Sequence, residues 1–320
     1  MPEVKELRSL EELEVLAPEW DILWARTGKS PFQSAMWLLP WARQFTRENL
    51  VVVSIRREGK LVAVCPFYVW NNRLFLLGNG ISDYLDICAA AGDIELLRGE
   101  LSGWLESQRF ADELEFNQLP ADSILLQIAP AGFQGVHRPG DSCPVLSLEN
   151  KEPDYFAPPR QLEKLRYYER RAAKIGDVKF EKATSENCGS FLDQLFKLHS
   201  ARWSEKGGGV LAETDLQQFH SRAVNAFARG GFLRMYRFRI GSEIAGVLYA
   251  FANERATFFY LSGFDPKFEK LSPGALMIGH AIREAMAEGN RAFDFLRGSE
   301  PYKYHWGACD QQTTNLLLSR

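Results

Sequence analysis

The sequence predicts an α+β fold, mixed α/β in content, with two tandem domains that each hold a mostly antiparallel mixed sheet flanked by helices. Three observations predict it. Residues 51–78 and 233–263 each alternate β-branched and aromatic runs with short polar turns and end at a glycine, which is typical of a three-stranded antiparallel meander. In both halves, helical segments precede the meander. A Pro-rich polar segment at 149–160 separates the halves.

The elements of the first half follow in order along the chain. The stretches SLEELEVLAPEWDILWAR (9–26) and SAMWLLPWARQF (34–45) indicate two helices. The turns EGK and NNR then divide 51–78 into strands. A helix at 94–108 and the strand ELEFNQL at 113–119 complete this half.

The second half repeats this order. Its helices lie at 190–206 and 214–230, and the turns GSE and NER divide its meander. A helix follows from 273 to 288, since Ser272 fits an N-cap, Pro273 fits the first turn and Gly289 fits the end of the helix. A further apolar strand leads to Gly298.

The repeated order indicates a duplicated domain. The alternative is a chance likeness between two meanders, which are common in proteins. We predict an N-terminal domain at 1–148, a linker with a bridging basic helix at 149–176, and a C-terminal domain at 177–320.

Composition excludes several classes of protein. Of the 320 residues 46% are hydrophobic and 25% charged, and the net charge of −3 gives no general attraction to nucleic acid or membranes. The five cysteines are scattered without a CxxC pair, so we expect no metal site. No apolar run is long enough for a membrane span, and the first residues do not resemble a signal peptide. We therefore expect a cytoplasmic protein.

The helix start at Ser272 is a candidate anion site. The first turn of a helix exposes unpaired N–H groups and a partial positive charge, so it can bind phosphate without a basic side chain. Gly274 has no Cβ, which would let an anion approach the backbone. The alternative is that Ser272, Pro273 and Gly274 only cap a helix.

Polar groups gather after the last strand of the second half. Asp294 lies between Phe293 and Phe295, where burial would raise the pKa of its carboxyl and make it a usable base. Tyr302 is a candidate general acid, and Lys303 a candidate for neutralising phosphate or polarising a carbonyl. A structural ion pair is the alternative for Asp294, and solvent exposure is the alternative for Lys303.

Further candidates lie on other elements. His199 falls on the apolar face of a helix, next to Arg202, Trp203 and a glycine run at 207–209 that would suit a mobile lid. The alternative for His199 is an ordinary core histidine. In the first half, Asp83 and Tyr84 follow the meander and are candidates for binding a substrate, or for a simple turn.

The segment RQLEKLRYYERRAAKIG is rich in basic residues. A helix over it would align them on one stripe, a candidate site for the phosphates of a nucleotide, a sugar phosphate or tRNA. The alternative is a solvated face. The stripe comprises Arg160, Lys164, Tyr167, Arg171 and Lys174.

Taken together, the segments resemble the GNAT superfamily of acyl-CoA N-acyltransferases. More narrowly, the chain is similar to the double-domain CelD/BioF2-like branch, which is related to the FemAB peptidyltransferases. The segment LSPG stands where the superfamily usually has Gln/Arg-x-x-Gly-x-Gly. The matching stretches are PFQSAMWLLPW (31–41), LLGNGISDYLDIC (76–88), KLRYYERRAAKIG (164–176), LHSARW (198–203), YLSGFDPKFEKLSPGALM (260–277) and FDFLRGSEPYKYHW (293–306).

The resemblance implies transfer of an acyl group from acetyl-CoA or another acyl-CoA to an amine, such as an amino sugar or another envelope or polysaccharide precursor. The second half would bind the donor and the first would be a degenerate copy. One alternative is a FemAB-like peptidyltransferase that uses aminoacyl-tRNA, and another is a non-catalytic binding module. The candidates are Asp294, Lys303, Tyr302 and His199 for catalysis; Lys270, Leu271, Ser272, Pro273, Gly274 and Ala275 for the cofactor; and Arg202, Trp203, Asp83, Tyr84 and Trp306 for the substrate.

Overall fold

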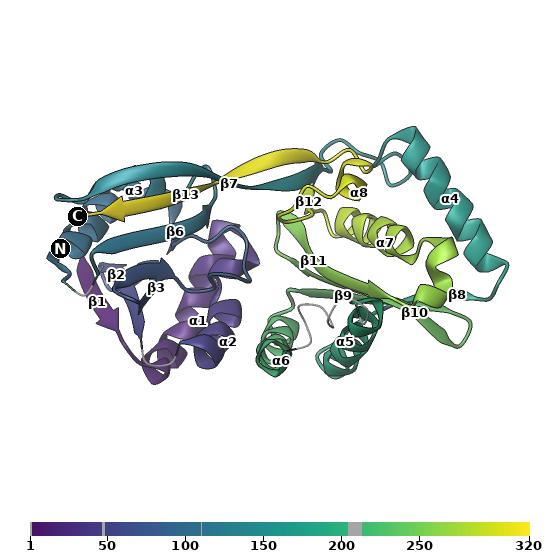
Figure 1. Ribbon diagram of the computed structural model, residues 1–320, viewed down its shortest axis with the longest axis horizontal. Helices are drawn as coiled ribbons and strands as arrows, with labels where there is room; N and C mark the ends of the chain where they lie inside the picture. Colours follow the sequence, from purple (N-terminus) through teal and green to yellow (C-terminus); the bar gives the residue numbers. More distant parts are fainter. Residues whose placement is uncertain (1, 47–48, 110, 204–212) are drawn as a thin grey trace. The chain divides into compact units, whose positions relative to one another are not determined.

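The computed structural model describes residues 2–46, 49–109, 111–203 and 213–320, without the side chains of residues 91 and 200–203. The chain forms two compact units (Figure 1). The first unit comprises Met1–Ser142 with Gln311–Arg320, and the second comprises Cys143–Asp310. In the part of the chain that is described, no helix combines the length and the apolar character needed to cross a membrane.

The first unit is built on a sheet with strand order β1-β2-β3-β4-β6-β13. Neighbouring strands are antiparallel except β4 and β6, which are parallel. The helices of this unit are α1 (Leu10–Thr27), α2 (Ala35–Phe45) and α3 (Ile94–Ser107). Its strands are β1 (Glu3–Leu7), β2 (Leu50–Arg57), β3 (Lys60–Trp70), β4 (Arg73–Leu76), β5 (Cys88–Ala89), β6 (Glu113–Leu119), and parts of β7 (Gln134–Ser147) and β13 (Cys309–Ser319).

Apolar strands and amphipathic helices give the first unit its core. The strands β2 and β3 are buried along most of their length because helices cover the sheet. Leu97, Leu101 and Trp104 of α3 pack with Phe67 and Phe116 of the sheet in one apolar cluster. Helix α1 contacts β3 and β5.

The second unit contains a sheet with order β7-β12-β11-β10-β9-β8, antiparallel except for the parallel pair β11 and β12. Helix α7 makes the crossover that a parallel pair requires. The strands are β8 (Val178–Lys182), β9 (Leu233–Ile240), β10 (Glu243–Ala252), β11 (Ala256–Phe264) and β12 (Ala292–Asp294). The helices are α4 (Pro159–Ala173), α5 (Cys188–Trp203), α6 (Thr214–Arg229), α7 (Pro273–Ala287), α8 (Pro301–Tyr304) and the 3₁₀-helix η6 (Pro266–Leu271).

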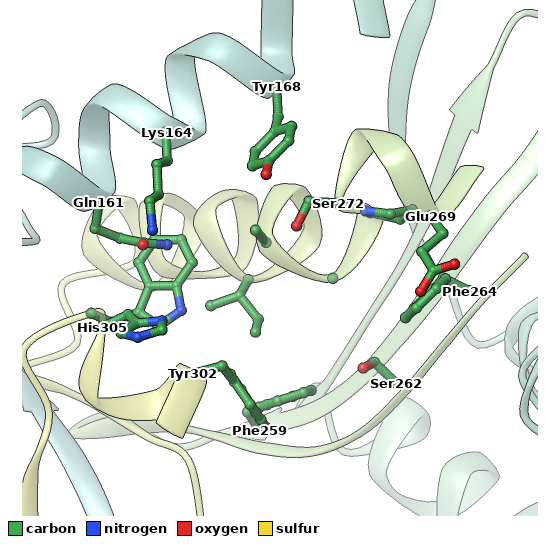
Figure 2. A pocket seen from close by; sticks show the side chains of 15 residues that line it. Gln161, Lys164, Tyr168, Phe259, Ser262, Phe264, Glu269, Ser272, Tyr302 and His305 are labelled. Atoms are coloured by element: carbon green, nitrogen blue, oxygen red, sulfur yellow. The ribbon is translucent and has the colours of Figure 1, made fainter. Parts of the chain in front are cut away.

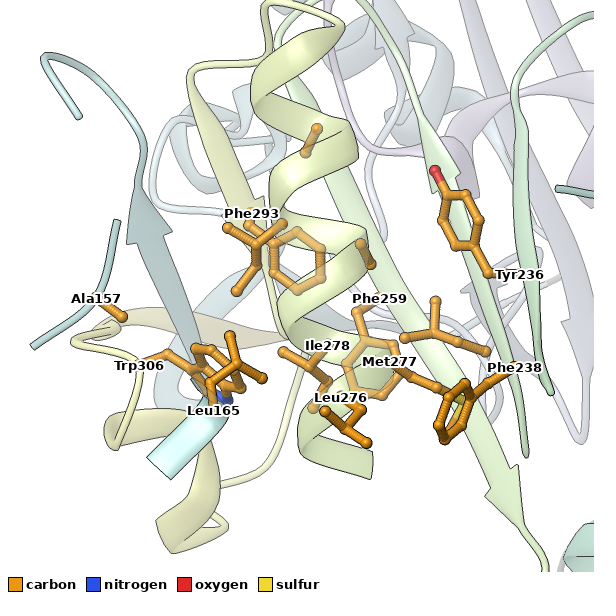
Figure 3. Packing of buried hydrophobic residues seen from close by; sticks show 14 of the residues in the cluster. Ala157, Leu165, Tyr236, Phe238, Phe259, Leu276, Met277, Ile278, Phe293 and Trp306 are labelled. Atoms are coloured by element: carbon orange, nitrogen blue, oxygen red, sulfur yellow. The ribbon is translucent and has the colours of Figure 1, made fainter. Parts of the chain in front are cut away.

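Helix α7 lies on one face of this sheet, and α5 and α6 lie on the other (Figure 1). The α7 face carries an aromatic core in which Phe259 and Phe293 pack near Leu276 and Ile278 of the helix (Figure 3). Helix α4 joins the same core through residues that include Leu165. The core therefore fixes α4, α7 and β11 relative to one another within the second unit.

The mixed α/β fold with mostly antiparallel sheets agrees with the sequence prediction, whereas the division of the chain differs. The predicted C-terminal domain at 177–320 includes residues 311–320, which belong to the first unit because Leu316 and Leu318 pack in its core. Helix α4, predicted as a bridge, lies within the second unit, where its Leu162 and Leu165 are part of the core.

Candidate functional site

The second unit contains a pocket of about 430 Å³ at the start of α7 (Figure 2). Its walls come from α4, β11, η6, α7 and the segment that contains α8. Aromatic rings and polar side chains both line these walls, a combination that is common in ligand pockets. The lining residues are Gln161, Lys164, Tyr168, Phe259, Ser262, Phe264, Glu269, Ser272, Pro273, Gly274, Ala275, Ile278, Tyr302, His305 and Trp306.

The pocket lies where two parallel strands stop pairing. The register of β11 and β12 ends at Phe258 and Asp294, although β11 itself continues to Phe264. The pairing of β11 with β10 also shifts its register nearby, between Leu261, which pairs with Tyr249, and Phe259, which pairs with Ala250. Beyond that point β11 supplies three side chains to the pocket, and the segment after β12 supplies three more.

The start of α7 presents a free backbone donor. Ser272 has a φ of 51° and does not cap the helix with its side chain. Its carbonyl accepts from the N–H groups of Ala275 (3.0 Å) and Leu276 (3.2 Å), and Pro273 has no N–H. The N–H of Gly274 has no acceptor among the described residues. A Cβ at Gly274 would meet no atom within 4 Å, so the backbone is open there.

Helix α4 supplies a second wall. Gln161, Lys164 and Tyr168 are spaced at i, i+3 and i+7, so they share the face that meets the pocket. Arg171 continues this face, and its Nη1 donates to the carbonyl of Lys270 at 3.1 Å. The basic stripe is thus divided: Lys164 faces the pocket and Arg171 holds the end of η6.

The structure brings some of the predicted site residues together. Ser272, Pro273, Gly274 and Ala275 line the pocket opposite Tyr302 and Trp306. The two other predicted cofactor residues do not line it. Leu271 is in the core, because the 3₁₀ turn directs its side chain inward, and Lys270 is exposed.

Asp294 is buried, as predicted, but does not line the pocket. Its Oδ1 accepts from the N–H of Leu296 at 2.7 Å. Leu296 has a φ of 57°, a left-handed conformation that is uncommon for a branched residue. The carboxylate therefore stabilises a tight turn directly after β12.

Lys303 is almost fully buried, contrary to the solvated alternative. Its ammonium donates to the carbonyls of Leu296 (3.1 Å), Arg297 (2.6 Å) and Gly298 (3.0 Å) and lies 3.0 Å from a carboxylate oxygen of Glu300. These acceptors occupy the hydrogens of the ammonium group, and Lys303 does not line the pocket.

The remaining predicted residues lie elsewhere. His199 is buried on α5, beside Gly263 of β11, and so packs against the sheet face opposite α7. The side chains of Arg202 and Trp203, and the glycine run at 207–209, lie outside the described residues. Asp83 and Tyr84 are buried in the first unit, where the carbonyl of Tyr84 accepts from the side chain of Gln33.

Several pocket residues were not among the predicted site residues. His305 adjoins Trp306 in the sequence, which could have indicated it. Gln161 and Tyr168 of α4 could have been found from their helical spacing with Lys164, which the predicted basic stripe already includes. Phe259, Ser262, Phe264 and Glu269 carry no distinguishing signal in the sequence. Among the described residues, no group of three or more His, Cys, Asp or Glu side chains is arranged to hold a metal ion.

Comparison with known proteins bears on the same region. Residues 159–304 match the family model described as an acetyltransferase (GNAT) domain. No curated protein matches the chain. Among solved structures, FemX is similar with a TM-score of 0.67 at 12% identity, covering 98% of this chain and 96% of that chain.

Two further solved structures have a similar fold. The C-terminal domain of a proposed lysylphosphatidylglycerol synthetase from Agrobacterium fabrum has a TM-score of 0.62 at 14% identity and covers 97% of this chain and 92% of its own. The L-PGS of Bacillus licheniformis has a TM-score of 0.61 at 12% identity, with 99% and 94% covered. At these identities the likeness establishes the fold across nearly the whole chain.

Proposed function

We propose that this chain is a GNAT-type N-acyltransferase that uses acetyl-CoA or another acyl-CoA, because residues 159–304 match the model of a GNAT acetyltransferase domain and the fold is similar to that of FemX. The donor would occupy the pocket of the second unit. The acceptor would be an amine, such as an amino sugar of an envelope or polysaccharide precursor, a class that we take from the family resemblance.

The observation that carries this proposal is the open N–H of Gly274 at the start of α7. A helix start attracts an anion through its free amides and its partial positive charge. Gly274 lines the pocket, and a Cβ at this position would meet no atom within 4 Å, so the backbone here is open to a ligand. The pyrophosphate of a CoA thioester fits that environment.

The strand edge beside the pocket suits the rest of such a donor. Beyond Phe258, β11 no longer pairs with β12, so this edge of β11 faces the segment that follows β12. Exposed strand edges bind extended amide-containing chains through backbone hydrogen bonds. The pantetheine arm of CoA contains two amides and could extend along this edge.

The chemistry is a direct attack by the acceptor amine on the thioester carbonyl. A C–N bond forms, the C–S bond breaks and the thiolate leaves, so one proton must leave the amine and another can reach the sulfur. Tyr302 lines the pocket and is partly exposed, which suits a general acid at the leaving group. Asp294, which does not line the pocket, stays our predicted base, and substitution tests this role.

One observation favours a second function, aminoacyl transfer. Glu269 lines the pocket and has no ion-pair partner among the described residues. A carboxylate there would repel phosphate but would attract the ammonium of an aminoacyl group. The similarity to FemX and to a lysylphosphatidylglycerol synthetase agrees with this alternative.

The test is calorimetry with acetyl-CoA on the wild type and on Gly274→Ala. The added methyl meets no protein atom but occupies the space of the phosphate, so we expect at least about a 10-fold loss of affinity with stability unchanged or slightly raised. Gly189→Ala on α5, also without a neighbour within 4 Å, is the matched control and should bind normally.

Three results would count against the acyl-CoA proposal. Equal affinity of the wild type and Gly274→Ala for acetyl-CoA would show that the start of α7 does not bind the donor. Tight binding of charged tRNA with a steep salt dependence, and none of acetyl-CoA, would favour the aminoacyl alternative. Binding of acetyl-CoA without turnover across a panel of amines would favour a non-catalytic binding module.

A further inference from the structure

The indole N–H of Trp306 is not used as those of three other buried tryptophans are. The indoles of Trp20, Trp24 and Trp37 donate to acceptors at 2.9, 2.7 and 2.8 Å. Trp306 is only 1% exposed, yet its N–H has no acceptor in the described part of the chain. The indole nitrogen is not fully enclosed by protein, and Trp306 lines the pocket. The N–H therefore opens on the pocket.

Packing holds this indole in place. Its ring stacks on Phe156 with centroids 6.1 Å apart and an interplanar angle of 14°. The backbone N–H of Trp306 donates to the carbonyl of Lys303 at 3.2 Å. A buried donor with no partner is costly unless a ligand or a water accepts from it. The fixed ring thus presents a donor that is ready for an acceptor in the pocket.

His305 adjoins Trp306 in the chain, and two more donors, Gln161 and Lys164, line the same pocket. Figure 2 shows Gln161, Lys164 and His305 on one side and Glu269 with Phe264 on the other. Lys164 and His305 have no carboxylate partner among the described residues. This end is therefore rich in donors, and the acidic group lies at the other end.

We propose that Trp306, Lys164, Gln161 and His305 form a second anion subsite that binds a terminal phosphate monoester of the donor, separate from the phosphate at Gly274. This inference rests on the proposed acyl-CoA function. A monoester offers three acceptor oxygens and nearly two charges, which match several convergent donors better than a diester does. CoA carries such a group on its 3′ oxygen, whereas every internal phosphate of a tRNA 3′ end is a diester.

The test compares CoA with 3′-dephospho-CoA by calorimetry on the full chain. We expect the wild type to bind CoA at least about 10-fold more tightly than the dephospho form. The ratio should fall toward one in Trp306→Phe, which keeps an aromatic ring but loses the N–H, and in Lys164→Gln. Arg166→Gln, on the exposed side of the same helix, removes the same charge and should keep the wild-type ratio.

Lys164→Gln keeps the experiment decisive if Trp306→Phe does not fold, because Lys164 is exposed. A ratio near one in the wild type, or an unchanged ratio in Lys164→Gln, would overturn the subsite. Adenosine 3′,5′-bisphosphate separates this outcome from failure of the proposed function. If acetyl-CoA does not bind but the bisphosphate binds and depends on Lys164, the subsite stands and the acyl-CoA function falls. If neither ligand binds, both fall.

Discussion

Two buried charges hold the turn that leads from β12 to the pocket. Asp294 accepts the N–H of Leu296 from one side, and Lys303 donates to three consecutive carbonyls from the other. Leu296 and Gly298 both have positive φ, at 57° and 107°, so the turn needs such support. The turn sets the position of α8, which carries Tyr302 to the pocket. This accounts for a carboxylate within an apolar strand.

Substitution of Asp294 separates support from catalysis. Asp294→Asn keeps an oxygen that can accept from Leu296, so we expect it to lower the free energy of unfolding by less than about 1 kcal/mol. Asp294→Ala leaves a buried N–H unpaired and should cost about 1–3 kcal/mol. Denaturant melts measure both.

Turnover of the same variants then tests the base. If Asp294 accepts a proton, Asp294→Asn should fold normally and lose roughly 10²-fold in kcat. Full activity of Asp294→Asn together with a destabilised Asp294→Ala would leave the residue a support for the turn and nothing more.

At the residue scale, prediction succeeded where local chemistry dominates. Ser272–Ala275 could be placed at a helix start because Ser-Pro-Gly has a strong local signature. The directions of Leu271 and Lys303 could not be predicted, since they depend on a 3₁₀ turn and on carbonyls brought close by tertiary folding. The sequence shows that Lys303 is charged, but it does not show which carbonyls accept hydrogen bonds from it.

At the element scale, close contact between α4 and α7 fixes one wall of the pocket. The two helices meet at Gly279, where a Cβ would lie 2.7 and 2.9 Å from the methyl carbons of Leu165. The absence of a side chain there lets α4 approach α7. That approach brings Lys164 and Tyr168 to the pocket.

Gly279→Ala tests this approach. Overpacking should lower the free energy of unfolding by about 1–3 kcal/mol and weaken donor binding, because α4 must shift. Gly274→Ala on the same helix is the control: without a clash it should be as stable as the wild type or up to about 1 kcal/mol more stable. Equal stability of both variants in denaturant melts would contradict the close contact.

The corresponding helix start in the first unit differs in charge. Asp93 precedes α3 and forms an ion pair with Arg57 at 2.7 Å, and Glu95 follows in the first turn. These carboxylates would repel an anion where α7 has an open amide. On this ground we propose that the first half is a degenerate copy, and the missing Ser-Pro-Gly already sets it apart in the sequence.

At the scale of the whole molecule, the two units carry buried groups whose pKa values are shifted in opposite directions. In the first unit, burial raises the pKa of Asp21 and of Asp86 to about 6, although Lys29 lies 3.8 Å from Asp86. In the second, burial lowers the pKa of His220 to about 3 and of His280 to about 4. Each group resists the charged form.

The signs give opposite slopes of stability with pH. Between about pH 4 and 6 the folded state binds more protons at Asp21 and Asp86 than the unfolded state does, so the stability of the first unit falls as pH rises through that range. The unfolded state binds more protons at the two histidines below pH 6.5, so the second unit loses stability as pH falls.

Hydrogen exchange followed by mass spectrometry can resolve the units. From pH 7.5 to 5 we expect the slowest amides of the first unit to gain about 1–2 kcal/mol of protection per carboxyl and those of the second to lose a similar amount per histidine, after correction for intrinsic rates. Asp21→Asn keeps an acceptor for the N–H of Ala35 and should reduce the first effect. Shifts of the same sign in both units would refute the assignment.

The duplicated architecture was predictable because meanders and helices leave periodic signals in each half. The return of the last strand, β13, to the sheet of the first unit was not predictable. The run of apolar residues that includes Leu316 and Leu318 indicates a strand, but its partner β6 lies almost 200 residues earlier, as the bond from Gln118 N–H to Asn315 at |i−j| = 197 illustrates. Local pattern does not specify so distant a pairing.

This late strand has a consequence for biosynthesis. The ribosome releases residues 311–320 only after the entire second unit has been made, and the first unit lacks one strand of its sheet until then. Unlike a simple tandem protein, in which the N-terminal domain can fold first, this chain would finish its trailing domain before its leading one. Until β13 is made, the edge of β6 that it later pairs with would stay open in the nascent first unit.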